Sequence, residues 1–136
     1  MIASGRGPRQ SDVVNPDWKK LDALAAAEIG TTISALPGPL RALAGKLPVT
    51  FARRPNVDLQ ADGIEADTLG LFVGAEFADE GNVPLPAQII LFLNNLWEYA
   101  GGNEAAFREE VRTTFLHELG HYLGLGEDEL MERDLD

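Results

Sequence analysis

The chain has 136 residues, and its composition already excludes several classes of protein. Hydrophobic residues make up 45% and charged residues 24%, which is the balance of a globular domain and not of a disordered chain. A chain of this length buries roughly two thirds of its unfolded surface, so it can be stable without crosslinks. There is no cysteine, which excludes disulfide scaffolds, thiolate zinc sites, iron–sulfur clusters and a cysteine nucleophile.

The charge balance is strongly acidic, with 22 Asp and Glu against 11 Lys and Arg and a formal net charge of −11. Such a surface is repelled by phosphate backbones and by anionic membranes. No apolar run approaches the ~20 residues of a membrane span, and residues 1–10 lack the apolar stretch of a secretory signal. We therefore expect a cytoplasmic monomer that binds neither nucleic acid nor membrane.

The composition of the chain changes at about residue 15. Residues 1–15 are rich in Gly, Pro and Ser and hold few large apolar side chains, so we predict a flexible N-terminal arm. Residues 16–136 contain no repeat and no low-complexity tract, and we predict that they form a single domain.

The first predicted element is a helix with Asn15 as its N-cap and Pro16 as its first residue. Apolar residues then recur at helical spacing to about Ala35. The Pro-Gly-Pro sequence at 37–39 ends this helix, and residues 40–46 are predicted to add one short helical turn.

Three strands are predicted next, at residues 47–52, 69–77 and 87–93, because these runs are apolar and β-branched. Two glycines in the second run indicate a bulge or a close approach of the backbone to a neighbour; they are Gly70 and Gly74. The polar segment 53–68 is predicted as a solvated loop, because its acidic residues lack the spacing and central glycine of an EF-hand calcium loop. Residues 94–102 are predicted as a connection.

The last predicted element is an amphipathic helix that begins after Asn103, a suitable N-cap, and runs to about Leu123. Gly124 and Gly126 are its stop signals. The only two histidines of the chain lie inside this helix, at 117 and 121.

The two histidines point in nearly the same direction, because residues four apart on a helix differ by about 40° in direction and by one turn. His117 and His121 are therefore suited to hold one metal ion. Glu118 projects about 100° from His117, where it can reach a water without competing as a ligand. The alternative to a metal site is that the histidines lie on a solvated helix face and that Glu118 makes an ordinary charge pair within the helix.

A third ligand is available just beyond the helix. Two imidazoles leave a tetrahedral zinc short of one protein ligand, and a turn at Gly124 can bring a carboxylate back to the ion. Glu127 lies three residues beyond Gly124 and is the favoured candidate, with its neighbour Asp128 as the competitor.

Residues 117–127 read HELGHYLGLGE, which resembles the extended zincin signature HExxHxxGxx(H/D/E). With its order of helix, strands and final helix, the chain resembles the small bacterial zincin-like metallopeptidases that have a minimal matrix-metalloprotease-like domain. The resemblance covers about residues 16–130, although only the stretch 117–127 is specific. It implies an α+β zincin-like fold, a small mixed sheet backed by the N-terminal helix and the active-site helix.

By position, the resemblance makes His117, His121 and Glu127 the ligands of one Zn²⁺ ion. It makes Glu118 the catalytic carboxylate, which takes the proton of the attacking water and delivers it to the leaving amine. The implied function is zinc-dependent hydrolysis of peptide bonds in a peptide or protein substrate. The acidic surface also predicts faster association with basic peptides.

The chain departs from the metzincin pattern, which has a histidine where this sequence has Glu127 and a later methionine turn beneath the metal. Met131 is predicted to be a packing residue. Tyr122 and Tyr99 are candidates to stabilise the oxyanion. The alternative for each is an ordinary packing role in the core or at the rim of the site.

In zincins a strand that lines the cleft pairs with the extended substrate, and either 69–77 or 87–93 could serve. Two other functions stay open. One is a zinc-binding interaction module without catalysis, and the other is a metal-free acidic adaptor.

Overall fold

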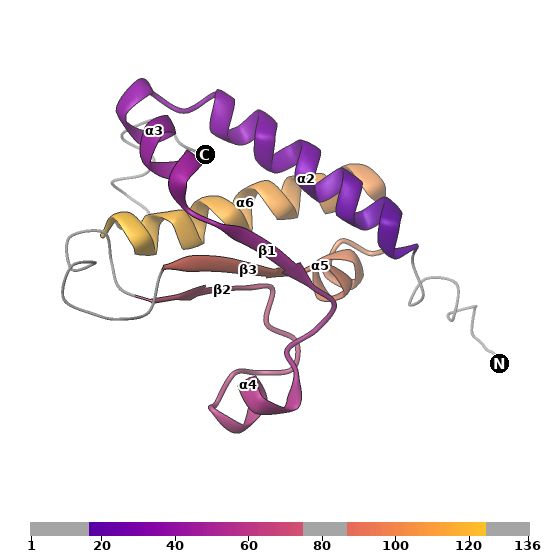
Figure 1. Ribbon diagram of the computed structural model, residues 1–136. Coiled ribbons are helices and arrows are strands. Elements are labelled where there is room, and N and C mark those ends of the chain that lie inside the picture. The colour runs from indigo at the N-terminus through magenta and orange to yellow at the C-terminus, as the bar shows by residue number, and fades with distance from the viewer. Residues whose placement is uncertain (1–16, 75–86, 125–136) are drawn as a thin grey trace, which may run out of the picture.

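The computed structural model describes residues 17–74 and 87–124. Two long helices lie on one face of a three-stranded sheet, and shorter helices surround it (Figure 1). The elements in chain order are α2 (Trp18–Ser34), α3 (Gly38–Lys46), β1 (Val49–Ala52), α4 (Val57–Ala61), β2 (Gly70–Val73), β3 (Gln88–Phe92), α5 (Leu93–Tyr99) and α6 (Glu104–Leu123). This is the α+β zincin-like architecture that the sequence predicts.

The sheet is mixed, with the strand order β1-β3-β2. β1 runs parallel to β3, and β2 runs antiparallel to it. Leu91 of β3 lies opposite Phe51 of β1 on one side and opposite Gly70 of β2 on the other. β3 is therefore the central strand, and β1 and β2 are the edges of the described sheet.

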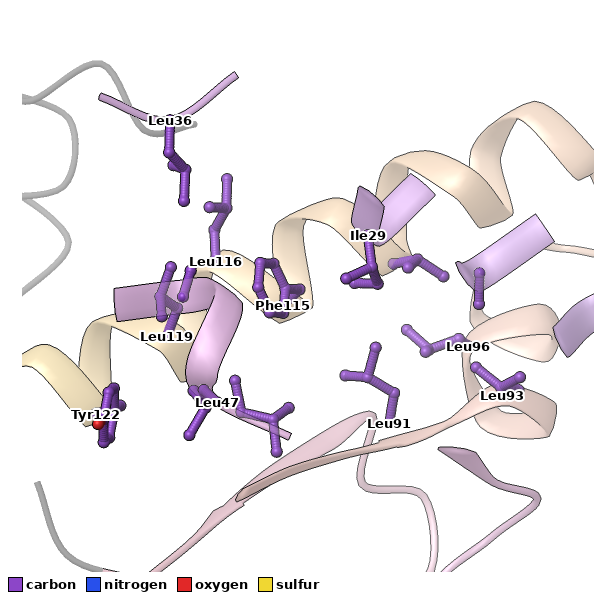
Figure 2. Packing of buried hydrophobic residues seen from close by; sticks show 14 of the residues in the cluster. Ile29, Leu36, Leu47, Leu91, Leu93, Leu96, Phe115, Leu116, Leu119 and Tyr122 are labelled. Atoms are coloured by element: carbon purple, nitrogen blue, oxygen red, sulfur yellow. The ribbon is translucent and has the colours of Figure 1, made fainter. Parts of the chain in front are cut away.

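The core lies between the sheet and the two long helices. Figure 2 shows Ile29 of α2, Phe115 of α6 and Leu91 of β3 in this layer. Alternate residues of β3 point into it, because the side chains of a strand alternate between its two faces. The largest fully buried side chains are Phe92, Phe107, Phe115, Leu21, Ile89, Leu91, Leu93, Leu96, Leu119 and Val111.

The first helix begins later than predicted. Trp18 is its first residue, and Asp17 is the N-cap, whose carboxylate accepts a hydrogen bond from the backbone N–H two residues on. Asp17, with the extended backbone and the side-chain oxygen of a cap, replaces Asn15 as the N-cap, so the predicted start at Pro16 was wrong. Asn15 and Pro16 themselves lie outside the described residues. The helix ends at Ser34, next to the predicted end.

Two short helices replace segments that the sequence predicts to be irregular. α4 interrupts the polar loop 53–68 and is capped by Asn56, whose side chain accepts from the backbone N–H of Leu59 at 2.8 Å. α5 occupies most of the connection 94–102, because Leu93 and Leu96, one helical turn apart, are both fully buried. Burial of this short apolar pair decides the structure there.

The strands are shorter than predicted. β1 starts at Val49, after Pro48, which has no N–H to donate but whose carbonyl accepts from Ile89 at 2.9 Å. β2 is described to Val73, and the remainder of the predicted run 75–77 lies outside the described residues. In the described part of the chain, no helix is long and apolar enough to cross a membrane.

Candidate metal centre

Helix α6 begins and ends at the capping residues that the sequence predicts, Asn103 and Gly124. The side chain of Asn103 accepts from the N–H of Ala106 at 2.8 Å, as predicted for the N-cap. Gly124 ends the helix in the left-handed conformation, with φ of 72°, which suits glycine. The histidine pair therefore lies in the last two turns of α6.

The rings of His117 and His121 lie side by side on the outer face of α6. Their centroids are 4.6 Å apart and their planes are inclined by 64°. Both residues are exposed. The prediction that the two side chains share one direction is confirmed, and the arrangement leaves them accessible from solvent.

Glu118 has a very different environment from that of its two neighbours. It is buried, with 8% of its surface exposed, and its Oε1 lies 3.3 Å from Nδ1 of His121. Ligand atoms of His117, Glu118 and His121 all lie within 4.8 Å of one another. The carboxylate is therefore held inside the site, which an ordinary solvated helix face would not require.

The donor set fits a zinc ion. Zinc binds imidazole nitrogen at about 2.0–2.1 Å in tetrahedral geometry, so two ring nitrogens on one ion lie roughly 3.3 Å apart. The ligand atoms of the cluster lie within 4.8 Å of one another, and both histidines are exposed. Two histidines four residues apart on one face of a helix can bind the same zinc ion. Among the described residues, this cluster brings together three groups that could hold a metal.

Strand β2 approaches this part of α6 very closely. A Cβ added to Gly70 would lie 2.6 Å from Cγ2 of Thr114, 3.2 Å from Cδ2 of Leu91 and 3.5 Å from Cγ of Glu118. Carbon atoms in normal contact are about 3.5–4.0 Å apart, so only glycine fits. This confirms the predicted close approach and explains how the strand covers Glu118.

A cavity of about 320 Å³ opens beside the buried carboxylate. It is lined by Leu69, Gly70, Glu110, Thr113, Thr114, His117 and Glu118. Of the two strands predicted as partners for a substrate, β3 is paired on both sides and β2 on one side within the described sheet. The edge next to the cavity is therefore that of β2.

Residues 45–136 of the chain match the model of a family described as zincin-like metallopeptidase. The chain belongs to the zincin-like metallopeptidase family. The matched segment contains the whole sheet, α6 and the His-Glu-His cluster. A comparison with curated proteins gave no match.

The predicted third ligand follows α6 in the chain. Glu127, its competitor Asp128 and the methionine Met131 all lie outside the described residues. The cluster therefore contributes two histidines and one carboxylate from α6, and the candidate that follows Gly124 stays a prediction.

The two tyrosines of the zincin-like domain lie in different environments. Tyr122 is buried, and its ring packs against that of Phe72 with centroids 5.8 Å apart, so the packing alternative holds for this residue. Tyr99 is exposed, at the end of α5, where it lines a second cavity and not the one beside the cluster.

Sequence analysis did not single out Asn95, whose side chain fixes the segment that leads into β2. This buried amide donates to the carbonyls of Ala66 and Thr68, at 2.8 and 2.9 Å. Its oxygen accepts from the guanidinium of Arg54 at 2.6 Å. Arg54 also pairs with Glu98, and this pairing raises the pKa of the guanidinium above its ordinary value. The segment that leads into β2 is thereby tied to α5.

Proposed function

We propose that this chain hydrolyses peptide bonds in a peptide or protein substrate with the help of one Zn²⁺ ion. The observation that carries the proposal is the pair of exposed histidine rings beside a buried glutamate, at the edge of β2. Membership of the zincin-like metallopeptidase family supports the same chemistry.

The proposed ligands are His117, His121 and, beyond the helix, Glu127, with Asp128 as the alternative third ligand. Zinc, when bound, supplies a Lewis acid that polarises the scissile carbonyl and makes water a stronger nucleophile. His117 and His121 would bind through neutral ring nitrogens, which are the form that coordinates metal.

Glu118 is the proposed general base and acid. It would take a proton from the attacking water and later return it to the leaving amine. Its burial against β2 and its contact with His121 hold the carboxylate at one position. A fixed and partly dehydrated carboxylate needs little reorganisation during the reaction.

The edge of β2 is the proposed binding surface for the substrate backbone. An unpaired strand edge presents N–H and C=O groups that an extended peptide can join as an additional strand. Leu69 and Gly70 line the cavity beside Glu118, so a peptide on this edge passes the candidate metal centre. The cytoplasmic location and the monomeric state expected from the sequence are retained as part of the proposal.

A peptide library incubated with the zinc-loaded protein, with and without a chelator, tests this function. We expect cleavage that the chelator abolishes and that Glu118→Gln reduces by several orders of magnitude while zinc stays bound. Glu109→Gln is the matched control, because Glu109 is exposed on the same helix and does not line the cavity. Cleavage that survives in Glu118→Gln, or no cleavage by the unsubstituted protein, would contradict the proposal. The latter result, with zinc bound, would favour a non-catalytic zinc-binding module.

A further inference from the structure

A second cavity lies next to the one at the candidate metal centre. It has a volume of about 270 Å³ and is lined by Asp67, Leu69, Asn95, Glu98 and Tyr99. Leu69 lines both cavities. The second cavity lies between α5 and the segment that leads into β2, so a peptide that continues along the β2 edge past the cluster reaches it at Leu69.

The walls of this cavity are acidic and aromatic. Asp67 is exposed and forms no ion pair within residues 17–74 and 87–124. Glu98 is paired with Arg54, so these three groups together leave one negative charge. Tyr99 is 67% exposed. The cavity therefore offers a carboxylate and an aromatic surface to whatever enters it.

Several of the polar groups that could bind an anion there already have partners. The guanidinium of Arg54 is bonded to both Asn95 and Glu98. The amide of Asn95 donates to two backbone carbonyls. A negatively charged ligand could accept from the hydroxyl of Tyr99 but would be repelled by Asp67. A cation would meet a complementary charge.

We propose that this cavity is a substrate subsite for the side chain of Lys or Arg. The proposal rests on the function proposed above and names a feature of its substrates. The alkyl stem would lie against Leu69 and the ring of Tyr99, and the cationic group would lie beside Asp67. A cation near an aromatic ring gains further attraction from it. The volume is below that of sites for drug-sized ligands, and it suits one side chain.

Binding of a peptide series tests the subsite separately from catalysis. The peptides share one background sequence, and each carries a single Lys, Gln or Glu at one of several successive positions. Every peptide is labelled with a fluorophore. Anisotropy is measured with zinc-loaded, full-length Glu118→Gln protein, so binding is read even where no hydrolysis occurs. We expect one position at which the Lys peptide binds about two- to fivefold more tightly than the Gln peptide, the scale of a single exposed charge pair.

Asp67→Asn should remove this preference without weakening the Gln peptide. Asp62→Asn removes the same charge from an exposed position on the same loop, outside the cavity, and should retain the preference. The preference should also decrease at high salt. Equal binding of Lys and Gln peptides at every position, no binding of any peptide, or a preference that persists in Asp67→Asn would overturn the subsite. Hydrolysis by the unsubstituted protein is scored apart from these results, so the subsite can fail while the peptidase proposal stands.

Discussion

Gly70 is the position at which one added methyl group should disturb the candidate site most. In Gly70→Ala the new Cβ would lie 2.6 Å from Cγ2 of Thr114, so β2 and α6 must separate by roughly 1 Å to reach normal contact. Overpacking of this kind costs about 1–3 kcal/mol. Replacing glycine by alanine returns about 0.4–1 kcal/mol through the unfolded chain. We expect a net loss of about 1–2 kcal/mol in the free energy of unfolding.

The same displacement should affect catalysis, if the proposed function is right. Glu118 lies behind Gly70, with its Cγ at 3.5 Å from the position of the added Cβ. A displacement of about 1 Å in an active site can reduce the rate by roughly 10²-fold. We therefore expect kcat/KM for a peptide substrate to fall much more than the loss of stability alone would explain.

Urea unfolding of five proteins measures the stability change. Gly70→Ala is compared with Gly30→Ala, a matched substitution in α2 where nothing lies within 4 Å and where alanine should stabilise by about 0.5–1 kcal/mol. Thr114→Ser removes the methyl group that clashes, and the double variant should recover part of the loss. The reasoning is refuted if Gly70→Ala is as stable as the unsubstituted protein and shows no coupling with Thr114→Ser.

Three further predictions follow from the polar contacts and from the metal. Asn95→Ala leaves the carbonyls of Ala66 and Thr68 without their donor, and we expect a loss of about 1–3 kcal/mol in urea unfolding; an unchanged midpoint would be evidence against this role. The raised pKa of Arg54 means that its pairing with Glu98 contributes where both groups are charged and is lost as the pH rises beyond the ordinary arginine range. The difference in stability between Glu98→Gln and the unsubstituted protein should therefore be constant from pH 6 to pH 9, about 1 kcal/mol or less for this half-exposed pair. Zinc at 100 times its Kd should stabilise the folded protein by about 2.7 kcal/mol, measured as a thermal shift that a chelator reverses.

The parts of the structure that local signals determine could be predicted from the sequence. Asn103 and Gly124 delimit α6, because a side-chain cap and a left-handed glycine act within one turn of the helix. Helical geometry alone fixes the relation of His117 to His121. The close approach of β2 was indicated by Gly70, since a glycine inside a strand has few other reasons to be there.

The parts that depend on tertiary packing could not be predicted in the same way. α5 is a helix because Leu93 and Leu96 are buried together. The pattern of polar and apolar residues in this seven-residue segment does not by itself predict that burial. The role of Asn95 depends on carbonyls 27 and 29 residues away in the chain. The position of β2 at an edge of the described sheet required the strand order, because apolar runs do not reveal which strand is central.

The zinc content of the purified full-length protein tests the central claim most directly. After equilibration with zinc and removal of the free metal, we expect one zinc ion per chain in the unsubstituted protein and in Glu118→Gln. His117→Ala and His121→Ala should retain little or none. The same near-zero content in all four proteins, or full zinc occupancy in both histidine variants, would contradict the assignment of this helix face as a metal centre.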